Sequence, residues 1–338
     1  MKNAIYIGSK SQTNSVYSNE TMNALSKELN FPYGNKTFTR AELKDYDLKD
    51  ISFLFSTWGM PELTEEEIAT YFPVLECVFY AAGSVQSFAR PFLNRGIKVY
   101  SAWIANGVPV AEFSLAEIIL ASKGFFTRLH IPGSGGVLDE SWKQTFPGNY
   151  PGNYDIKVGI ISTGAIGGKV IELIKKSLEH IEILVFSTSM TKEKADSLGV
   201  TLVDLPTLFR EADVISNHMA DNEKTRGMLN YDLLSLMKDT AVFINTGRGA
   251  QVVEEDLVRA LTEVPSRAAV LDVTFPEPSP AGHPFYDMKN VYITPHIAGS
   301  LGNEVHRMAD YMVEEFRLYR DGKPTHYEIT LKMLETMA

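Results

Sequence analysis

The stretch GIISTGAIGG, residues 159–168, follows an apolar run and precedes a helix-length segment, and it decides which fold the chain can adopt. Turns that bind dinucleotides usually read G-x-G-x-x-G and lead from a strand directly into a helix. Here Gly164 and Gly167 are the second and third glycines, while Ser162 stands at the first position. A helix starting near Ile166 would direct free N–H groups at an anion. Alone, the altered pattern fits an ordinary glycine-rich turn equally well; the strand before it and the helix after it favour a nucleotide site.

Short apolar runs alternate with helix-length segments on both sides of this turn. They are AIYIG, ISFLFS, CVFYAA and IKVY in the first third, then KVGIIS, EILVFS, DVISNH, AVFINT, AAVLDV and VYITP. Strands that are apolar on both faces are typical of parallel sheets covered by helices. One early helix is expected to begin at Thr64, because Glu67 completes a capping box. The pattern therefore predicts two doubly wound α/β domains.

Composition limits the partners of the protein. Its 338 residues suffice for two domains, and a net charge of −10 argues against nucleic acid or an anionic membrane as partner. No run reaches the ~18 uninterrupted apolar residues of a membrane span, and the N-terminus enters a strand-like run. The single cysteine, Cys77, excludes an internal disulfide and a cysteine-based metal cluster, and its apolar context predicts a buried strand position. We therefore expect a cytoplasmic protein without a metal.

Three longer segments complete the expected layout. Residues 108–126, VPVAEFSLAEIILASKGFF, predict a helix that is apolar on more than one side, with a subunit interface as one candidate cover. The Gly- and Pro-rich residues 131–153 predict a loop, and residues 302–320 predict a further helix. From Thr325 onward the chain needs a docking place that its sequence does not reveal.

Three consecutive strand ends carry polar groups suited to one reaction. AVFINTGRG ends on Arg248, AAVLDVTFPEP delivers Asp272 and Glu277, and VYITPHIAGS delivers His296. The carboxyl ends of parallel strands meet at one edge of a sheet, so these side chains should gather there. A guanidinium clamps a carboxylate, an imidazolium gives a proton to a carbonyl oxygen, and a neighbouring carboxylate holds the ring. Singly, each residue could equally serve a turn or the solvent; together they match reduction of a 2-keto acid.

The end of the strand that follows the glycine-rich turn bears on the cofactor. NAD-binding folds usually place Asp or Glu after the second strand, where it binds the ribose hydroxyls, but this chain has Ser187. Without that carboxylate, a 2′-phosphate would not be repelled, so we expect weak discrimination between NAD and NADP. Lys192 and Lys194 nearby fit a solvated loop better than a phosphate site.

The motifs together resemble the D-isomer-specific 2-hydroxyacid dehydrogenase family, which includes phosphoglycerate dehydrogenases and glyoxylate/hydroxypyruvate reductases. The resemblance is densest over residues 158–302, through MKDTAVFINTGRGAQVVEEDLVRAL, LDVTFPEP and ITPHIAGS in order. DVISNHMADNEKTRGML matches the preceding block, with Ala220 where proline is common, and NGVPVAE matches the start of the interdomain helix.

The resemblance implies a Rossmann NAD(P)-binding domain, residues 104–298, inserted into a flavodoxin-like substrate domain, residues 1–103 and 299–338. It implies a homodimer built on the nucleotide domain, and a small 2-keto or 2-hydroxy acid as substrate. By position, the catalytic residues would be Arg248, Glu277 and His296. The cofactor, NAD or NADP, would be bound by Gly164, Ala165, Ile166, Gly167, Ser187, His218, Ala220, Thr225, Thr246 and Asp272. The substrate would meet Trp58, Ser84, Val85, Asn106 and Arg248.

Further departures from the family pattern concern the substrate. AAGSVQS places Val85 and Ser87 where a glycine and an aspartate are common beside the substrate carboxylate. Residues 51–67 contain no Arg or Lys, whereas Trp58 and Met60 offer apolar surface, with Trp58 equally able to pack in the core. Lys10 alone seldom suffices for a phosphate monoester, so an unphosphorylated substrate, small or with an apolar side chain, is expected. The alternative function is an NAD(H)-sensing, corepressor-like binding protein of the same fold.

Overall fold

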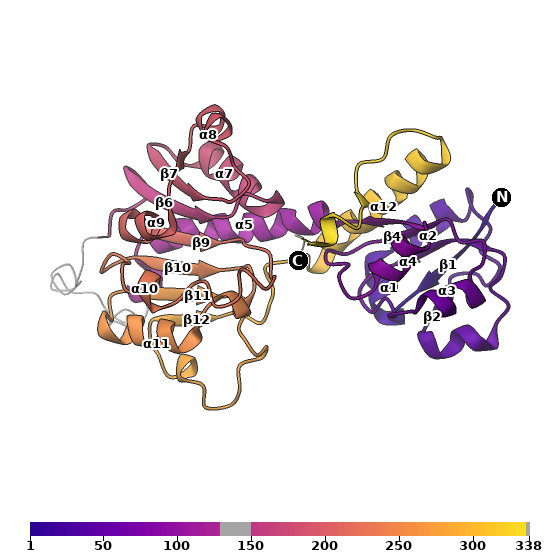
Figure 1. Cartoon of the computed structure of the whole chain (residues 1–338), viewed down its shortest axis with the longest axis horizontal. Coiled ribbons are helices and arrows are strands. Elements are labelled where there is room, and N and C mark those ends of the chain that lie inside the picture. Colours follow the sequence, from indigo (N-terminus) through magenta and orange to yellow (C-terminus); the bar gives the residue numbers. More distant parts are fainter. Residues whose placement is uncertain (129–149, 336–338) are drawn as a thin grey trace. The chain divides into compact units, whose positions relative to one another are not determined.

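A computed structural model describes residues 1–128 and 150–335 (Figure 1). Most of the loop predicted at 131–153 falls at 129–149, outside the described residues. The chain forms two compact units, one from Met1–Gly107 with Ser300–Ala338 and the other from Val108–Gly299. The second unit is thus inserted into the first, and both are α/β units with largely parallel sheets, which confirms the predicted fold class.

The first unit is built on a six-stranded sheet in the order β13-β5-β4-β3-β1-β2. The strands are β1 (Asn3–Ile7), β2 (Thr37–Phe38), β3 (Ile51–Ser56), β4 (Cys77–Tyr80), β5 (Lys98–Ser101) and β13 (Glu328–Ile329). All pair in parallel except β13, which runs antiparallel to β5. The order β2-β1-β3-β4-β5 is that of flavodoxin-like folds. The tail after Thr325 therefore docks on the sheet edge at β5.

Helices cover both faces of this sheet. They are α1 (Lys10–Val16), α2 (Asn19–Leu25), α3 (Glu65–Tyr71), α4 (Ala89–Asn94) and α12 (Val305–Arg320), with 3-10 turns at Arg40–Asp45, Gly302–Glu304 and Met333–Glu335. α3 begins at the predicted capping box of Thr64 and Glu67. α12 packs through Phe316, whose ring centroid lies 5.6 Å from that of Phe53. Its fully buried Glu315 accepts the backbone N–H groups of residues 326 and 327, which fixes the returning tail.

The second unit contains a seven-stranded parallel sheet in the order β12-β11-β10-β9-β6-β7-β8. Its strands are β6 (Ile156–Ile161), β7 (Ile181–Phe186), β8 (Thr201–Leu202), β9 (Val214–Asn217), β10 (Val242–Asn245), β11 (Ala268–Leu271) and β12 (Val291–Ile293). Counted from β6, this is the Rossmann order 3-2-1-4-5-6 with one further strand. The direction of winding reverses between β6 and β9, where such sheets bind ligands.

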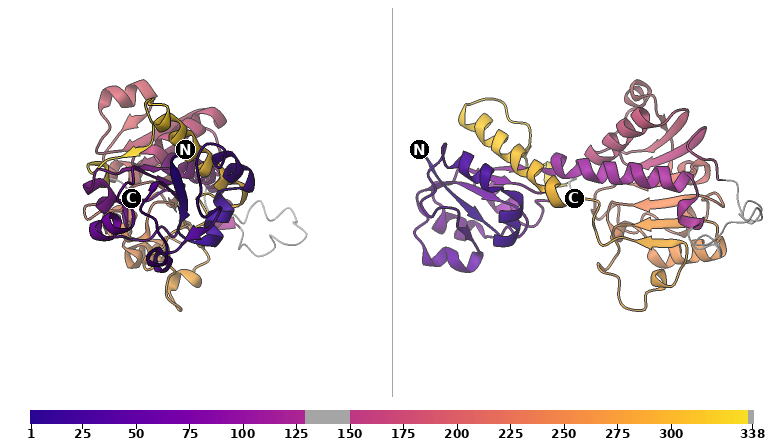
Figure 2. Two further views of the ribbon diagram at one scale, coloured as in Figure 1. Left: turned by 90° about the vertical axis from the view of Figure 1, so that its right-hand side faces the viewer. Right: turned by 180° about the vertical axis from the view of Figure 1, so that it is seen from behind.

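Two apolar layers sandwich this sheet. The helices are α5 (Trp103–Ser122), α6 (Phe125–Arg128), α7 (Ala165–Ser177), α8 (Lys192–Leu198), α9 (Leu205–Glu211), α10 (Tyr231–Leu234) and α11 (Glu254–Glu263), with 3-10 turns at Gly249–Gln251 and Pro284–Tyr286. One core joins α5 and α7 to the sheet, and the other joins α9, α10 and α11 to the opposite face. Figure 2 shows α5 lying along the sheet of this unit.

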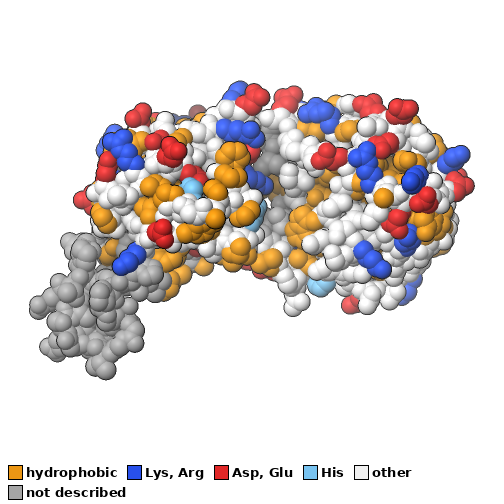
Figure 3. Space-filling model, turned by 90° about the horizontal axis from the view of Figure 1, so that it is seen from below, with side chains coloured by type: hydrophobic (Ala, Val, Ile, Leu, Met, Phe, Trp, Pro, Cys, Tyr) orange, Lys and Arg blue, Asp and Glu red, His pale blue; other side chains and the backbone are white. Residues whose placement is uncertain are grey.

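α5 begins at Trp103, five residues before the predicted start, and ends at Ser122. By length and composition it could cross a membrane, but half of its apolar stretch is buried, and buried core helices have the same composition. Ala111 and Ile118 pack in the core of the second unit, so burial explains the apolar sequence. On the face drawn in Figure 3, acidic and basic side chains are interspersed over the described surface.

Candidate functional site

The glycine-rich turn follows β6 and opens α7, as the sequence predicts. Ser162, at the position of the first glycine, has a φ of +73°. This left-handed conformation is one that glycine adopts freely and a serine adopts at a cost of about 1–2 kcal/mol. Its backbone N–H donates to the carbonyl oxygen of Phe186 over 2.7 Å. The turn thus keeps its tight bend although the glycine is absent.

The two remaining glycines have separate structural roles. A Cβ atom on Gly167 would lie 2.0 Å from the carbonyl oxygen of Ser162, so only glycine lets helix and strand pack this closely. Gly164, the N-cap of α7, has no neighbour within 4 Å of such an atom. Open space in front of a helix N-terminus fits a pyrophosphate group approaching the backbone. The turn therefore fits a bound dinucleotide.

The end of β7 is tied to this turn. The hydroxyl of Thr163 donates to Oγ of Ser187 over 2.9 Å, and Ser187 Oγ lies 3.3 Å from Ser189 Oγ. Ser187 thus occupies the place of the expected carboxylate with a neutral hydroxyl. Ala165 is exposed and Ile166 half-buried at the start of α7, next to the open space at Gly164.

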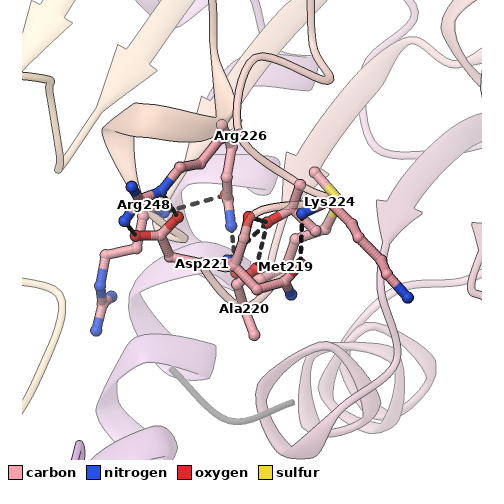
Figure 4. Close-up of polar contacts among 9 residues, drawn as sticks. Met219, Ala220, Asp221, Lys224, Arg226 and Arg248 are labelled. Carbon is pink, nitrogen blue, oxygen red and sulfur yellow. Dashed lines mark hydrogen bonds and ion pairs between the residues drawn. The ribbon is translucent and has the colours of Figure 1, made fainter. Parts of the chain in front are cut away.

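The loop after β9 is fixed by its own hydrogen bonds. Thr225 Oγ1 donates to the carbonyl oxygen of Ala220 over 2.8 Å, and accepts from the N–H of Asn222 over 3.0 Å. Arg226 holds Asp221 through two contacts of 3.0 Å. Figure 4 shows this ion pair beside Arg248. The Thr225 side chain therefore stabilises the loop, and its predicted contact with the cofactor stays a prediction.

His218 lies in a buried chain of hydroxyl groups. Its Nε2 is 2.9 Å from Ser216 Oγ and its Nδ1 is 3.2 Å from Thr246 Oγ1, which in turn is 3.3 Å from Ser114 Oγ. Burial lowers the pKa of His218 to about 3, so the ring is neutral. His218 and Thr246 are thus brought together, with a neutral imidazole linking β9 to β10.

Arg248 follows β10 and is held at its backbone by two side chains that sequence reasoning missed. Gln251 Oε1 accepts from the N–H of Arg248 over 3.2 Å and from Asn217 Nδ2 over 2.6 Å. Asn245 Nδ2 donates to the carbonyl oxygen of Arg248 over 3.3 Å. The guanidinium itself donates to Gly247 O over 2.8 Å and is partly exposed. The backbone of Arg248 is thus held in place, and the guanidinium N–H groups that do not bind Gly247 can bind an anion.

Glu277 and His296 form a direct pair. Nδ1 of His296 lies 2.6 Å from Oε1 of Glu277, and the two side chains are 47% and 41% exposed. His296 has a φ of +55°, and its N–H donates to the carbonyl oxygen of Asp272 over 3.1 Å. Because Nδ1 faces the carboxylate, Nε2 is the nitrogen directed at other groups. The pair has the geometry of a general acid held by a carboxylate.

Asp272 holds the segment that carries His296. Its Oδ1 accepts from Thr294 Oγ1 over 2.6 Å and from the N–H of Ile297 over 2.8 Å, while Oδ2 accepts from the N–H of Ala298 over 3.0 Å. The buried carboxylate is therefore already bound by three donors. This anchoring role was missing from the sequence-based prediction, which assigned Asp272 to cofactor binding.

A depression of about 670 Å³ borders the Glu277–His296 pair in the second unit. It is lined by Asp272, Thr274, Glu277, Pro278, Ser279, Phe285, Tyr286, Val291, Ile293, Thr294, Pro295 and His296. Within the described residues, no three His, Cys, Asp or Glu side chains are grouped as a metal ion would require.

Another buried acid escaped sequence reasoning. Glu117, on α5, is 6% exposed, and its Oε2 has no hydrogen-bond partner among the described residues. Burial, with a smaller contribution from the negative charge of Asp272, raises the pKa of Glu117 to about 8. The carboxyl group is therefore largely protonated at neutral pH. An isolated Glu in an apolar helix gives no sequence signal that separates it from a solvated residue.

In the first unit, Asn106 lies beside the predicted substrate loop. Its Oδ1 accepts from the N–H of Ser300 over 3.1 Å, and a Cβ atom on Gly83 would lie 3.3 Å from its Nδ2. Ser84 is exposed, whereas the side chain of Val85 is fully buried in the core. Only the backbone of Val85 could therefore meet a ligand.

The apolar surface expected after β3 is smaller than predicted. Met60 is 8% exposed, so the prediction that it offers surface is wrong. Trp58 is partly buried and packs against the core of the first unit, as the alternative interpretation anticipated. Lys10 is exposed at the first residue of α1.

Comparison with known proteins points in one direction. Residues 126–298 match the model of the D-isomer-specific 2-hydroxyacid dehydrogenase NAD-binding domain. Over 260 residues the chain is 30% identical to the D-3-phosphoglycerate dehydrogenase of Synechocystis sp., covering 76% of this chain and 45% of that protein. Over 166 residues it is 37% identical to the glyoxylate reductase of Aeropyrum pernix, covering 49% of each. The matched regions thus span about half the length of these relatives.

The fold recurs in a solved structure. The phosphoglycerate oxidoreductase of Rhizobium etli superposes with a TM-score of 0.79 at 19% identity, covering 99% of this chain and 100% of that one. The relatives bear the names of dehydrogenases and reductases, so the alternative of a non-catalytic, NAD(H)-sensing protein gains no support from them.

Proposed function

The chain belongs to the D-isomer-specific 2-hydroxyacid dehydrogenases, an NAD-binding family, and we propose that it interconverts a 2-keto acid and the corresponding D-2-hydroxy acid. The single observation that carries this proposal is the 2.6 Å contact between His296 Nδ1 and Glu277 Oε1. An imidazole held in this way can donate a proton from Nε2 and take it back in the reverse direction.

In the proposed reaction, Arg248 binds the substrate carboxylate through two parallel hydrogen bonds. His296 Nε2 gives its proton to the carbonyl oxygen, which becomes the hydroxyl group of the product. Glu277 accepts from Nδ1 and balances the charge of the imidazolium before the proton leaves. In the oxidation direction the same nitrogen takes the hydroxyl proton.

The dinucleotide would lie on the turn between β6 and α7. The open space at Gly164, the close packing at Gly167 and the exposed N-terminus of α7 support this placement. When bound, the nicotinamide supplies the hydride for reduction or accepts it in the reverse reaction. The neutral hydroxyl of Ser187 supports use of either NAD or NADP, since it neither binds the ribose diol as a carboxylate does nor repels a phosphate.

For the substrate we propose an unphosphorylated 2-keto acid, small or with an apolar side chain. Residues 51–67 supply no Arg or Lys that a phosphate monoester would require. Because Met60 is buried, it offers no apolar surface to a substrate. The proposal therefore rests mainly on the lack of cationic side chains in this segment.

We also propose a homodimer formed through the nucleotide-binding unit. Leu120 at the end of α5 is 38% exposed and Phe125 at the start of α6 is 40% exposed, as expected of apolar side chains that a partner covers. Light scattering of the full chain tests this: a mass near twice 37.7 kDa is expected, and a monomer would contradict it.

The function is tested by following NADH and NADPH oxidation with a panel of 2-keto acids that includes glyoxylate, hydroxypyruvate, an apolar keto acid and 3-phosphohydroxypyruvate. Turnover of an unphosphorylated member with the highest kcat/KM is expected. Preference for the phosphorylated compound would overturn the substrate proposal. Cofactor binding without turnover of any keto acid would overturn the enzymatic function.

A further inference from the structure

The second unit contains another Glu–His pair. His283 Nε2 is 3.3 Å from Glu254 Oε2, and these side chains are only 16% and 11% exposed. The N–H of Phe285 donates to His283 Nδ1 over 3.3 Å, which places the ring proton on Nε2, facing Glu254. The ring of His283 also packs at 4.4 Å, centroid to centroid, from that of Phe285. This partly buried pair has no part in the proposed proton transfer.

The other oxygen of Glu254 holds the backbone of the loop that carries Glu277. Glu254 Oε1 accepts from the N–H of Phe275 over 2.8 Å. Just before this residue, the backbone of Thr274 lies so close to Gly249 that a Cβ there would be 2.1 Å from its carbonyl carbon. The start of α11 and the turn before it therefore clamp the first residues of this loop.

The same carboxylate fixes the far end of the loop. Phe275 and His283 flank Glu277, so Glu254 binds both sides of the loop that brings Glu277 to His296. Burial raises the pKa of Glu254 above its usual value, while the Phe275 N–H and His283 lower it. The hydrogen bond from Phe275 and the 3.3 Å contact with His283 meet on this one carboxylate, so its loss would free both sides of the loop.

We propose that Glu254 and His283 are positioning residues for the acid–base pair. They set the 275–283 loop so that the carboxylate of Glu277 reaches Nδ1 of His296. This inference rests on the proposed function, because the pair it positions is the one to which we assign proton transfer. Misplacing a catalytic group by about 1 Å can lower the rate on the order of 100-fold.

Three variants of the full chain test the inference. Glu254→Ala removes both contacts, and Glu254→Gln keeps an oxygen that can still accept from Phe275. Glu255→Ala is the matched control, because this exposed carboxylate shares the first turn of α11. The measurements are kcat and KM for the keto acid, NADH affinity by fluorescence, the solvent deuterium isotope effect on kcat, and amide exchange of the 273–280 segment.

For Glu254→Ala we expect kcat to fall on the order of 10- to 100-fold, with NADH affinity and KM within about twofold of the wild type. The isotope effect should increase, because proton transfer becomes slower, and exchange of the loop should be faster. Glu254→Gln, which keeps only the contact with Phe275, should recover part of the loss, and Glu255→Ala should behave as the wild type.

The inference would be overturned by an active wild-type enzyme whose kcat and isotope effect are unchanged in Glu254→Ala, even if the loop exchanges faster. Equal losses in Glu255→Ala would also overturn it, since they would reflect helix charge alone. Failure of the proposed function looks different: the wild type itself would turn over no keto acid, while exchange of the loop would still report on the anchor.

Discussion

A Cβ atom on Gly167 would lie 2.0 Å from the carbonyl oxygen of Ser162, so the helix that follows the turn presses directly against the residue that replaces the usual first glycine. The close approach explains why this glycine is retained. Ser162 itself has a left-handed backbone, with a φ of +73°. Different substitutions at these two positions should therefore have opposite effects.

Gly167→Ala should destabilise the second unit by about 1–3 kcal/mol, because the added atom cannot fit without moving the turn. Dinucleotide affinity should fall with it. Gly168→Ala is the control, since its Cβ would meet Thr163 O at an ordinary 3.8 Å. Denaturant unfolding and NADH titration measure both effects. Equal stability of the two variants would contradict the packing argument.

Ser162→Gly should be tolerated and should raise the free energy of unfolding by up to about 1 kcal/mol, because glycine has no penalty at this φ. NADH affinity should stay near that of the wild type. Urea unfolding monitored by fluorescence provides the test. Clear destabilisation would mean that the hydroxyl of Ser162 contributes more than its backbone conformation costs.

Glu117 should make stability depend on pH. Its pKa of about 8 in the folded protein exceeds that of an unfolded glutamate, near 4.3. The contribution to stability is therefore fully present below pH ~4.3 and is lost as pH rises toward 8, since only the unfolded chain ionises in between. Glu117→Gln should remove this slope and be more stable than the wild type at pH 8 by a few kcal/mol.

The matched control is Glu112→Gln, an exposed glutamate on the same helix. Unfolding by urea at several pH values compares the three proteins. Parallel curves for the wild type and Glu117→Gln between pH 5 and 8 would show that Glu117 is solvated or ionised in the folded state.

Most of the fold was predictable because the buried strands consist mainly of apolar residues. Every predicted apolar run corresponds to a strand, whereas the two-residue strands β2, β8 and β13 were missed because so few residues carry no periodicity. The start of α5 was placed five residues too late, because the predicted helix was taken from the apolar run that begins at Val108, whereas the helix begins at Trp103.

The candidate site was predictable only for residues whose side chains would themselves bind the substrate or move the proton. Glu277 and His296 come together as expected. Gln251 and Asn245, which hold the backbone of Arg248, escaped because both are oriented by Asn217, which lies far away in the chain. The burial of Val85 likewise follows from packing that a short polar-looking loop does not reveal.

The cofactor preference should follow the side chain at the end of β7. We expect the wild type to use NADH and NADPH with similar kcat/KM, and Ser187→Asp to shift the preference toward NADH, because a carboxylate repels a 2′-phosphate. Ser187→Asn, similar in size but uncharged, is the control. Wild-type discrimination against NADPH by hundreds-fold would contradict this interpretation.

Arg248 should be needed for its shape as well as its charge. Arg248→Lys should lower kcat/KM for the keto acid nearly as much as Arg248→Ala, because lysine cannot form two parallel hydrogen bonds to a carboxylate. Steady-state kinetics of both variants, with NADH binding as a check on folding, provide the test. Recovery of most activity in Arg248→Lys would show that Arg248 acts as a simple positive charge.

The most direct measurement is kcat for keto-acid reduction by His296→Ala, made beside NADH titration of the same protein. Loss of the proton donor should lower kcat by ~10² to 10⁴ while the affinity for NADH stays close to that of the wild type. That result would place His296 in the chemical step. A variant that binds NADH and turns over keto acid at nearly the wild-type rate would contradict the assignment of His296 as the acid.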